Sequence, residues 1–336
     1  MERSLQDSWI LGGLTVPNRV VLAPLAGIGN WFVRLQAKRF GAGLVVSEMV
    51  SSFAIHYGNE KTLTELLRIH PDERAAGSGG PISIQLFGHD PGVMRSAAAT
   101  VAEAGADLID LNMGCPVPKV MKTGAGAAML KDPDTAVAVA RAAAEGSGLP
   151  VTVKLRASNL PGQMEGVEVA ERLVHDAGVA GITFHPRSAA VRHKGTPDYD
   201  LAATLVERLP VPVIVSGGMH GAEHIRWVFD HTGCEAVMLA RGALGNPWLF
   251  AQVLDGGGPE PSRGQVLEEW EWVLDRAVEH LGPDRAVRYL RKFHPWYIER
   301  LGESRAVQDA MQRAESIEDQ RTVIRSLDPV LSSAAA

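Results

Sequence analysis

The chain has 336 residues, of which 46% are hydrophobic and 21% charged, with a formal net charge of −6. This composition is ordinary for a soluble globular protein with a real core. No apolar run of about 18 residues predicts a membrane span, the N-terminus lacks a signal-peptide pattern, and two cysteines are too few for a disulfide framework, so we expect a cytoplasmic protein. The negative charge argues against broad, unspecific nucleic-acid binding but not against a local basic patch.

Eight short apolar runs rich in β-branched residues alternate with Ala-rich amphipathic segments. The runs are Arg19–Ala23, Leu44–Met49, Ile82–Phe87, Leu108–Met113, Val151–Arg156, Gly181–His185, Val213–Ser216 and Ala236–Arg241. Continuous apolar strands that alternate with helices predict a parallel sheet buried on both faces. Eight such units favour an α/β fold closed into a (β/α)8 TIM barrel over an open sheet.

The pattern changes after Gly258–Pro261, which has the composition of a linker. Beyond it only helical patterns follow. We therefore expect a catalytic barrel over residues 1–255 and a small all-helical domain over residues 262–328. The long connection Ser51–Pro81 joins the second and third strands, and its Gly77–Gly80 stretch predicts a flexible, functional loop.

The residues at the strand ends are the candidates for chemistry, because such barrels build their active sites from the loops after the strands. Ala23–Gly27 would let the backbone approach a flat ligand, or would simply form a tight turn. Gln85 must find hydrogen-bond partners, either on a flavin ring edge or on neighbouring backbone. Lys154 is costly to bury without a negative partner, which would be a reduced flavin or an acid such as Asp110 or Glu48.

Two further strand ends carry reactive side chains. Cys115 lies on a Gly-Cys-Pro turn after the fourth strand, where we expect an exposed thiol that donates a proton or acts as a nucleophile. The alternative is an inert buried thiol, the role that we expect for Cys234. His185 and Arg187 follow the sixth strand and would contact a cofactor or substrate and a phosphate, although a lone His is usually structural.

Glycines and a basic residue follow the seventh and eighth strands, at Ser216–Gly218 and Ala240–Ala243. Loops in these positions form the recurrent phosphate site of the fold. Glycines expose backbone N–H groups, and Arg241 adds a charge-assisted fork. The pattern predicts a phosphate-binding cup for a cofactor or a phosphorylated substrate, but it does not name the reaction.

The chain resembles the tRNA-dihydrouridine synthase family, and most closely its bacterial B-type branch, from about Leu14 to Leu327. The resemblance is carried by APLAG, VVSEMV, ISIQLFG, DLIDLNMGCPVPKVMKTGAGAAML, VTVKLR, ITFHPR, ARGALGNPWLF and YLRKFHPWYIERL. It implies that NADPH reduces FMN and that hydride passes from flavin N5 to C6 of a uridine in tRNA. It also implies that Cys115 protonates C5.

The resemblance assigns further residues. The family's FMN positions fall on Pro24, Leu25, Ala26, Gln85, Lys154, His185, Ser216, Gly217, Gly218, Ala240 and Arg241. The implied substrate contacts are Asn112, which orients the base, and the basic residues Lys119, Lys122, Arg187, Arg288, Arg291 and Lys292.

The segment Arg285–Arg300 holds five Lys or Arg against one acid, which predicts a basic stripe or a solvated helix face. Trp296 and Tyr297 are expected in the domain core. We expect no metal, no membrane contact and no protein partner, and a monomer is favoured.

The chain departs from the family pattern at three places. Gly29-Asn30 replace the usual Thr-Asp, Ser216–Gly218 replace Asn-Gly-Asp, and Arg187–Ala189 replace Arg-Thr-Arg. The second change removes side-chain contacts but leaves backbone N–H groups for a phosphate.

Three other functions remain open. An FMN-barrel reductase of a small molecule, of the dihydroorotate or enoate type, would not need the helical RKFHPWY segment. A flavin-free lyase that uses Lys154 as a Schiff base would be colourless when purified. A non-catalytic tRNA-binding relative would not need both Cys115 and Lys154.

Overall fold

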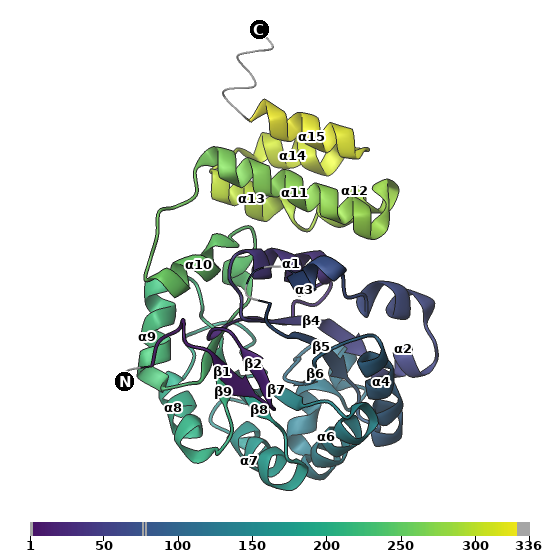
Figure 1. Ribbon diagram of the computed structural model, residues 1–336, viewed down its shortest axis with the longest axis vertical. Coiled ribbons are helices and arrows are strands. Elements are labelled where there is room, and N and C mark those ends of the chain that lie inside the picture. The colour runs from purple at the N-terminus through teal and green to yellow at the C-terminus, as the bar shows by residue number, and fades with distance from the viewer. Residues whose placement is uncertain (1–2, 76, 78, 328–336) are drawn as a thin grey trace. The chain divides into compact units, whose positions relative to one another are not determined.

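A computed structural model describes residues 3–75, 77 and 79–327. The chain divides into two compact units. Figure 1 colours the chain by residue number, from purple at the N-terminus to yellow at the C-terminus. One comprises Met1–Arg241 with Phe250–Gly257, and the other Gly242–Leu249 with Gly258–Ala336. None of the described helices combines the length and apolar content that a membrane crossing requires.

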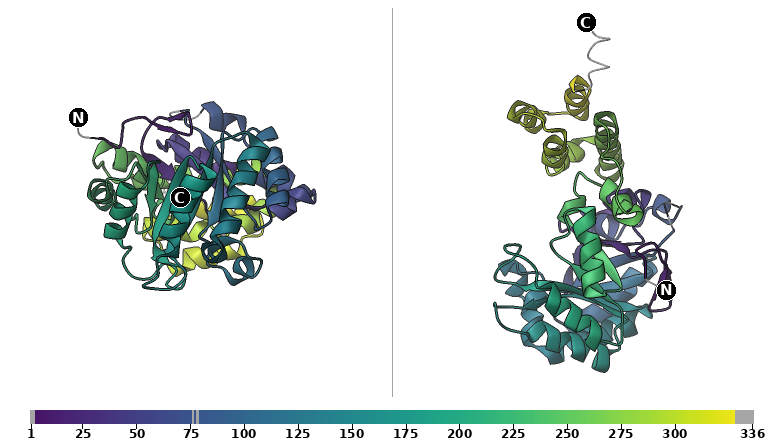
Figure 2. Two further views of the ribbon diagram at one scale, coloured as in Figure 1. Left: turned by 90° about the horizontal axis from the view of Figure 1, so that it is seen from below. Right: turned by 90° about the vertical axis from the view of Figure 1, so that its left-hand side faces the viewer.

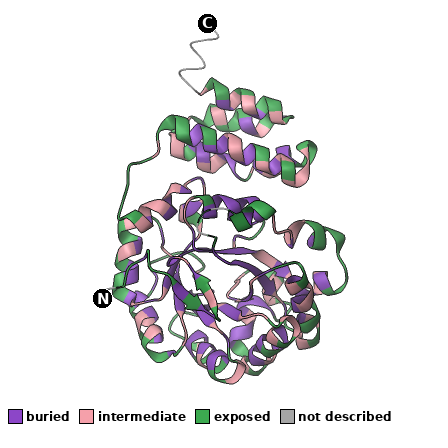
Figure 3. Ribbon diagram, viewed as in Figure 1, coloured by how far each residue is buried: buried purple, intermediate pink, exposed green. Residues whose placement is uncertain are grey.

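The first unit is built on eight parallel strands. They are β3 Val20–Leu22, β4 Leu44–Ser51, β5 Ile82–Phe87, β6 Leu108–Met113, β7 Val151–Ser158, β8 Gly181–Ser188, β9 Val213–Ser216 and β10 Ala236–Leu239. They pair in the order β10-β3-β4-β5-β6-β7-β8-β9 and close into a barrel, which confirms the predicted (β/α)8 fold. Figure 3 shows the strands almost wholly buried, because one face fills the barrel and the other packs under helices.

Three strands run further than the apolar runs predicted: β4 to Ser51, β7 to Ser158 and β8 to Ser188. His185 and Arg187 therefore lie within a strand rather than in the loop after it. Proline has no backbone N–H to donate to the hydrogen bonds of a sheet, so Pro186 predicted the end of this strand. The ladder instead shifts register between Arg156 and Ser158, and pairing resumes at Ser188.

Helices surround the barrel: α1 Trp31–Arg39, α4 Pro91–Glu103, α6 Pro133–Ser147, α7 Glu165–Ala177, α8 Tyr199–Arg208 and α9 Ala222–Thr232, while α10 Trp248–Asp255 spans the division between the units. Side chains of Asn30, Asp90, Asp132 and Asp198 cap four of them by accepting backbone N–H bonds. Asn30, at one departure from the family pattern, thus starts α1 by accepting from Phe32 and Val33.

The connection between β4 and β5 contains three short helices among its described residues. It contains α2 Ser52–His56, the π-helix η1 Thr62–Leu66 and α3 Pro71–Ala75. A buried ion pair between Arg34 and Glu73 (Nε to Oε1, 2.8 Å) ties it to α1. A Cβ on Gly80 would lie 1.8 Å from the Gly43 carbonyl oxygen, so this glycine permits a close approach of the two backbones. Within Gly77–Gly80, Ser78 lies outside the described residues.

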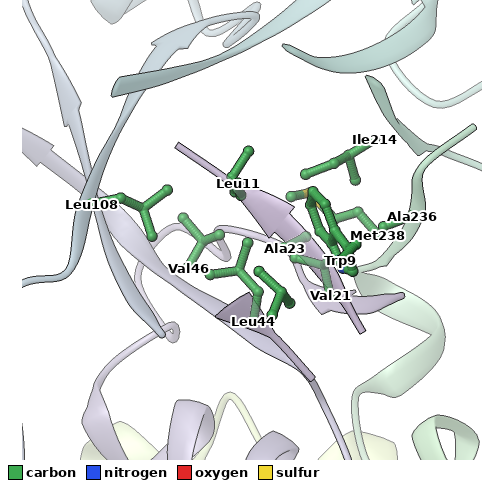
Figure 4. Close-up of a cluster of buried hydrophobic side chains, with 11 residues drawn as sticks. Trp9, Leu11, Val21, Ala23, Leu44, Val46, Leu108, Ile214, Ala236 and Met238 are labelled. Atoms are coloured by element: carbon green, nitrogen blue, oxygen red, sulfur yellow. The ribbon is translucent and has the colours of Figure 1, made fainter. Parts of the chain in front are cut away.

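An antiparallel hairpin of β1 Trp9–Leu11 and β2 Leu14–Val16, which was not predicted, precedes the barrel. Gly12 and Gly13 join its strands, with φ of +58° and +88°, which suits a tight hairpin turn. Figure 4 shows its apolar side chains packed onto residues near the strand starts, including Leu44, Leu108, Ile214 and Ala236. The hairpin therefore fills the end of the barrel opposite the strand C-termini.

Short helices follow several strands: α5 Pro118–Met121 and the 3-10 helices η2 Gly126–Lys131 and η3 Arg241–Ala243. The second unit consists of α11 Arg263–Leu281, α12 Pro283–Leu290, α13 His294–Leu301, α14 Arg305–Arg313 and α15 Ile317–Ser326, seen packed together in Figure 2. A capping box at Ser262 starts α11.

Trp270 stacks on Tyr297 in the core of this unit, with ring centroids 5.5 Å apart, and donates to His294 Nδ1 (3.1 Å). Tyr297 is buried as expected, whereas Trp296 is half-buried.

Candidate active site

The loop after β6 presents the free thiol of Cys115, which is half-buried rather than fully exposed. The Asn112 side-chain oxygen accepts from the backbone N–H groups of Gly114 (3.2 Å) and Cys115 (2.9 Å). The Cys115 carbonyl accepts from the Ala127 N–H (3.0 Å), which folds the loop onto η2. The thiol is therefore carried on a loop tied at both sides, whereas Cys234 is fully buried as predicted.

Gln85 is fully buried on β5, and its partners are side chains rather than backbone. Its Nε2 donates to Asp110 Oδ2 (2.6 Å) and its Oε1 accepts from Asn112 Nδ2 (2.8 Å). Asp110 also accepts from Thr152 Oγ1 (2.7 Å). Burial raises the pKa of Asp110 to about 6. An amide has further hydrogen-bonding capacity, so Gln85 could still meet a ligand.

The ammonium of Lys154 on β7 donates to the Ser216 hydroxyl (3.1 Å). Within the described residues it forms no ion pair with Asp110 or Glu48, the two acids considered as partners. Burial, and then Arg156, lower the pKa of Lys154 to about 8, while Asp110 opposes the shift. The Lys therefore has a polar partner but no carboxylate against it.

The surroundings of His185 favour its neutral form. Burial, followed by Lys154 and Arg156, holds its pKa far below the usual range. Its Nε2 lies 3.3 Å from Nη1 of Arg187. A guanidinium can only donate, so Nε2 accepts and the ring proton lies on Nδ1.

Arg156 is a site residue that was not predicted. Its Nε donates to the Gly114 carbonyl (2.9 Å), and its Nη1 donates to the Arg192 carbonyl (2.8 Å). It therefore braces the Cys115 loop. Lys154 and Arg156 are two residues apart on one strand and share a face, which is the signal that could have identified it.

The turn after β9 depends on two consecutive glycines in the left-handed region, Gly217 (φ +100°) and Gly218 (φ +77°). A Cβ on Gly217 would lie 2.5 Å from the His185 ring. Tyr199 on α8, which was not predicted, donates to the Gly217 carbonyl (2.9 Å), and His224 Nε2 lies 3.2 Å from the same hydroxyl. The turn is thus built for glycine and held by a tyrosine.

Unused cationic donors lie beside this turn. Arg241 is exposed and, within the described part of the chain, has no hydrogen-bond partner. The Arg187 Nε is buried without a partner, although its Nη2 donates to the Gly195 carbonyl. Desolvation and neighbouring cations, including Arg241, lower the pKa of His193 to about 4 and also lower the pKa of His220. This arrangement suits an anionic group.

The predicted segment after β3 forms a tight turn. The Leu25 carbonyl accepts from the N–H groups of Ile28 (3.1 Å) and Gly29 (2.7 Å). Pro24 is half-buried, Leu25 is buried and Ala26 is exposed. Ala240, at the end of β10, is half-buried. These residues lie at strand C-termini, the end of the barrel that carries Cys115.

The predicted RNA contacts fall into two groups. Lys119 on α5 and Lys122 after it are exposed on the barrel unit. In the helical unit Arg288 and Lys292 are exposed and Arg291 is half-buried.

The basic stripe of the helical unit spans α12, a turn and α13 rather than one helix face. Arg300 is paired with Glu260 (2.6 Å), so it contributes less free charge than predicted. No cluster of His, Cys, Asp or Glu that could hold a metal ion occurs among the described residues.

The dihydrouridine synthase family profile matches residues 21–334. A protein named tRNA-dihydrouridine synthase B from Pseudomonas aeruginosa is 33% identical over 94% of this chain and 94% of its own length. Another of that name, from Escherichia coli K12, is 33% identical over 92% of this chain and 97% of its own.

Two solved structures share the barrel fold at low sequence identity. A morphinone reductase variant in complex with tetrahydroNAD superposes with a TM-score of 0.58 at 17% identity, covering 79% of this chain and 94% of its own. A 2-naphthoyl-CoA reductase superposes with a TM-score of 0.61 at 14% identity, covering 76% of this chain and 52% of its own. The family profile and the long relatives together establish that this chain belongs to the dihydrouridine synthase family.

Proposed function

We propose that the protein is a tRNA-dihydrouridine synthase that reduces the C5–C6 double bond of a uridine in tRNA, with FMN as cofactor and NADPH as reductant. The observation that carries the proposal is the Cys115 thiol, held on a braced loop at the barrel end that also carries Lys154, His185 and the glycine turn. Relatives named for this activity match more than nine-tenths of the chain.

The residues present fit the phosphate of FMN. Gly217 and Gly218 offer backbone N–H groups in a turn that excludes side chains. Arg241 and the unpartnered Arg187 Nε supply donors with positive charge. This assigns Arg187 to the cofactor phosphate as well as to the substrate role that the resemblance implies.

The residues also fit the flavin ring. When bound, FMN would supply the hydride that the uracil receives at C6. Lys154 is largely protonated at neutral pH and forms no ion pair with a described carboxylate, so it can hold the electron-rich N1–O2 side of the ring. Neutral His185 keeps a proton on Nδ1 and can donate it in a hydrogen bond. Gln85 offers its remaining amide capacity, and Pro24–Ala26 form the turn against which a flat group can lie.

Cys115 would give its thiol proton to C5 of the uracil. Asn112 and Arg156 hold the loop that carries this thiol, which limits the orientations of the Sγ atom. A positioned proton donor accelerates such a step by roughly 10²- to 10⁴-fold. The uridine must leave its stack to reach the thiol.

The tRNA would be held by exposed or half-buried cations on both units. Lys119 and Lys122 lie near the Cys115 loop in sequence, and Arg288, Arg291 and Lys292 lie on the helical unit. Phosphate contacts of this kind position the RNA without reading its sequence. We accordingly assign residues 1–255 as the FMN-binding catalytic domain and residues 262–328 as the tRNA-binding domain of a cytoplasmic, monomeric enzyme.

Replacement of Cys115 by alanine tests the proposal. The variant should retain the flavin absorbance of the purified protein and lose at least about 100-fold in the rate of dihydrouridine formation in tRNA. The matched control is Cys234→Ala, which removes the other, buried cysteine and should leave the rate close to wild type. A wild-type rate for Cys115→Ala would show that another group is the acid, and a protein that takes up no FMN would refute the flavin assignment.

A further inference from the structure

A chain of side-chain hydrogen bonds runs from the barrel interior to the Cys115 loop. It begins at the buried carboxylate of Asp110, which accepts from Thr152 Oγ1 (2.7 Å) and from Gln85 Nε2 (2.6 Å). Gln85 Oε1 accepts from Asn112 Nδ2 (2.8 Å), and Asn112 Oδ1 accepts from the backbone N–H of Cys115 (2.9 Å). Asp110 is thus three hydrogen bonds from the loop and does not touch it.

The barrel register places these side chains together. Gln85 on β5 is the register partner of Asp110 on β6, and Asp110 is in turn the partner of Thr152 on β7. Asn112 lies two residues further along β6, so it points to the same face one step closer to the site. Short connections across neighbouring strands therefore link the barrel interior to the loop.

The donors and acceptors in this series of hydrogen bonds have a fixed order. The two ends of a carboxamide have nearly the same outline, so an isolated Gln or Asn can take either orientation. Here the termini of the chain are unambiguous, because an ionised carboxylate only accepts and a backbone N–H only donates. Asp110 requires the Gln85 NH₂ group, which turns the Gln85 oxygen toward Asn112. That oxygen requires the Asn112 NH₂ group, which leaves the Asn112 oxygen for the loop.

We propose that Asp110 is a positioning residue for Cys115, acting through the enforced orientations of Gln85 and Asn112. Its carboxylate sets the sense of the hydrogen bonds that link it through Gln85 and Asn112 to the loop. The role of Cys115 as a proton donor rests on the proposed function. The hydrogen bonds that position its loop do not, because they require neither FMN nor tRNA.

The direction can be reversed by exchanging two residue types. In Asn112→Asp, the new carboxylate can still accept from the loop but cannot donate to Gln85, which then faces two acceptors. In the double variant Asp110→Asn/Asn112→Asp, the new amide at position 110 donates to the Gln85 oxygen and accepts from Thr152. Gln85 then turns its NH₂ group toward position 112, so its two hydrogen bonds are restored in the opposite sense, while Thr152 and the loop N–H donate as before.

Hydrogen–deuterium exchange of the backbone N–H groups of residues 114 and 115 measures the result in the full-length protein. A buried polar group left without its partner costs enough to predict exchange at least about fivefold faster in Asn112→Asp. The double variant should return to within about twofold of the wild-type rate. The control Thr152→Val removes a hydrogen bond from the same Asp110 carboxylate, but not from the path to the loop, and should leave this exchange unchanged.

Exchange in Asn112→Asp at the wild-type rate would overturn the proposal, as would a double variant that exchanges as fast as Asn112→Asp. If Asn112→Asp does not fold, thermal unfolding gives the same comparison: a folded double variant supports the proposal, and an unfolded one refutes it. The measurement uses neither tRNA nor turnover. An active Cys115→Ala variant would therefore refute the proposed acid while leaving the exchange result intact.

Discussion

Replacing Gly218 by alanine tests whether the turn after β9 binds a phosphate. Gly218 has φ of +77°, and a Cβ there would lie 2.4 Å from the Tyr199 hydroxyl oxygen. That hydroxyl donates to the Gly217 carbonyl (2.9 Å), so the added methyl group opposes both the backbone conformation and the contact that holds it.

The two costs can be added. An L-residue in the left-handed region costs ~1–2 kcal/mol, and loss of the Tyr199 hydrogen bond costs ~0.5–1.5 kcal/mol. The variant can relieve both by reshaping the turn when no ligand is bound. FMN binding would have to restore the native turn, so the full cost of ~1.5–3.5 kcal/mol would be subtracted from the binding free energy. Since 1.4 kcal/mol is a factor of ten in affinity, FMN should bind roughly 10- to 300-fold more weakly.

The assay compares dissociation constants of FMN and riboflavin, which differ only in the phosphate. Gly218→Ala should weaken FMN binding by the stated factor and riboflavin binding by less than about threefold, because the damage is confined to the turn. The matched control is Gly178→Ala after α7, where φ is +65° and no atom would meet the Cβ. Its backbone strain should lower Tm by about 2–4 °C per kcal/mol without changing FMN affinity.

Either of two results would refute this reasoning. If Gly218→Ala keeps FMN affinity within about twofold of wild type, the phosphate does not sit on this turn. If riboflavin affinity falls as far as FMN affinity, the variant has disturbed the ring site and carries no information on the phosphate.

The helical unit allows two more predictions. The double variant Arg288→Glu/Lys292→Glu should lower tRNA affinity at least about tenfold and flatten its salt dependence, with FMN binding unchanged; equal affinity at all salt concentrations would exclude these cations. Burial lowers the pKa of His294 to about 3 from 6.5. The unfolded chain therefore takes up this proton first, so stability is complete above pH 6.5 and falls as pH drops toward 3. Urea unfolding should show a loss of ~2 kcal/mol from this group by pH 5, which His294→Gln should abolish.

The barrel could be predicted from the sequence because its signal is local. Eight apolar runs separated by amphipathic segments allow few other topologies. The glycines after β9 and β10 predict a phosphate site from their position, and this stays a prediction. The hairpin β1–β2 escaped prediction because three-residue strands are too short to show alternation. The end of β8 was placed too early because Pro186 interrupts the apolar run, and only the neighbouring strand shows that pairing resumes at Ser188.

Apart from Arg156, the supporting residues of the site could not be predicted, because their roles arise from contacts between distant segments. Tyr199 reaches the Gly217 carbonyl across 18 positions of sequence, and Asp110 meets Gln85 across 25. Nothing local to Tyr199 distinguishes it from a core aromatic residue. Asp110 lies in an apolar strand and was considered only as a partner for Lys154, whereas the structure gives it Thr152 and Gln85 instead.

Burial and positive neighbours together determine the electrostatics of the site. The resemblance implies an acid where this chain has Gly218. Among the described residues, the hydrogen-bond partner of Lys154 is the neutral hydroxyl of Ser216. Burial is the main cause of the lowered pKa values of His185 and His193, and the neighbouring charges that add to it are Lys, Arg and His groups. Like charges held together in a partly buried mouth oppose one another until an anion arrives. A dianionic phosphate would relieve that repulsion, so this chain should depend on the charge of its cofactor more strongly than a relative that retains the acid.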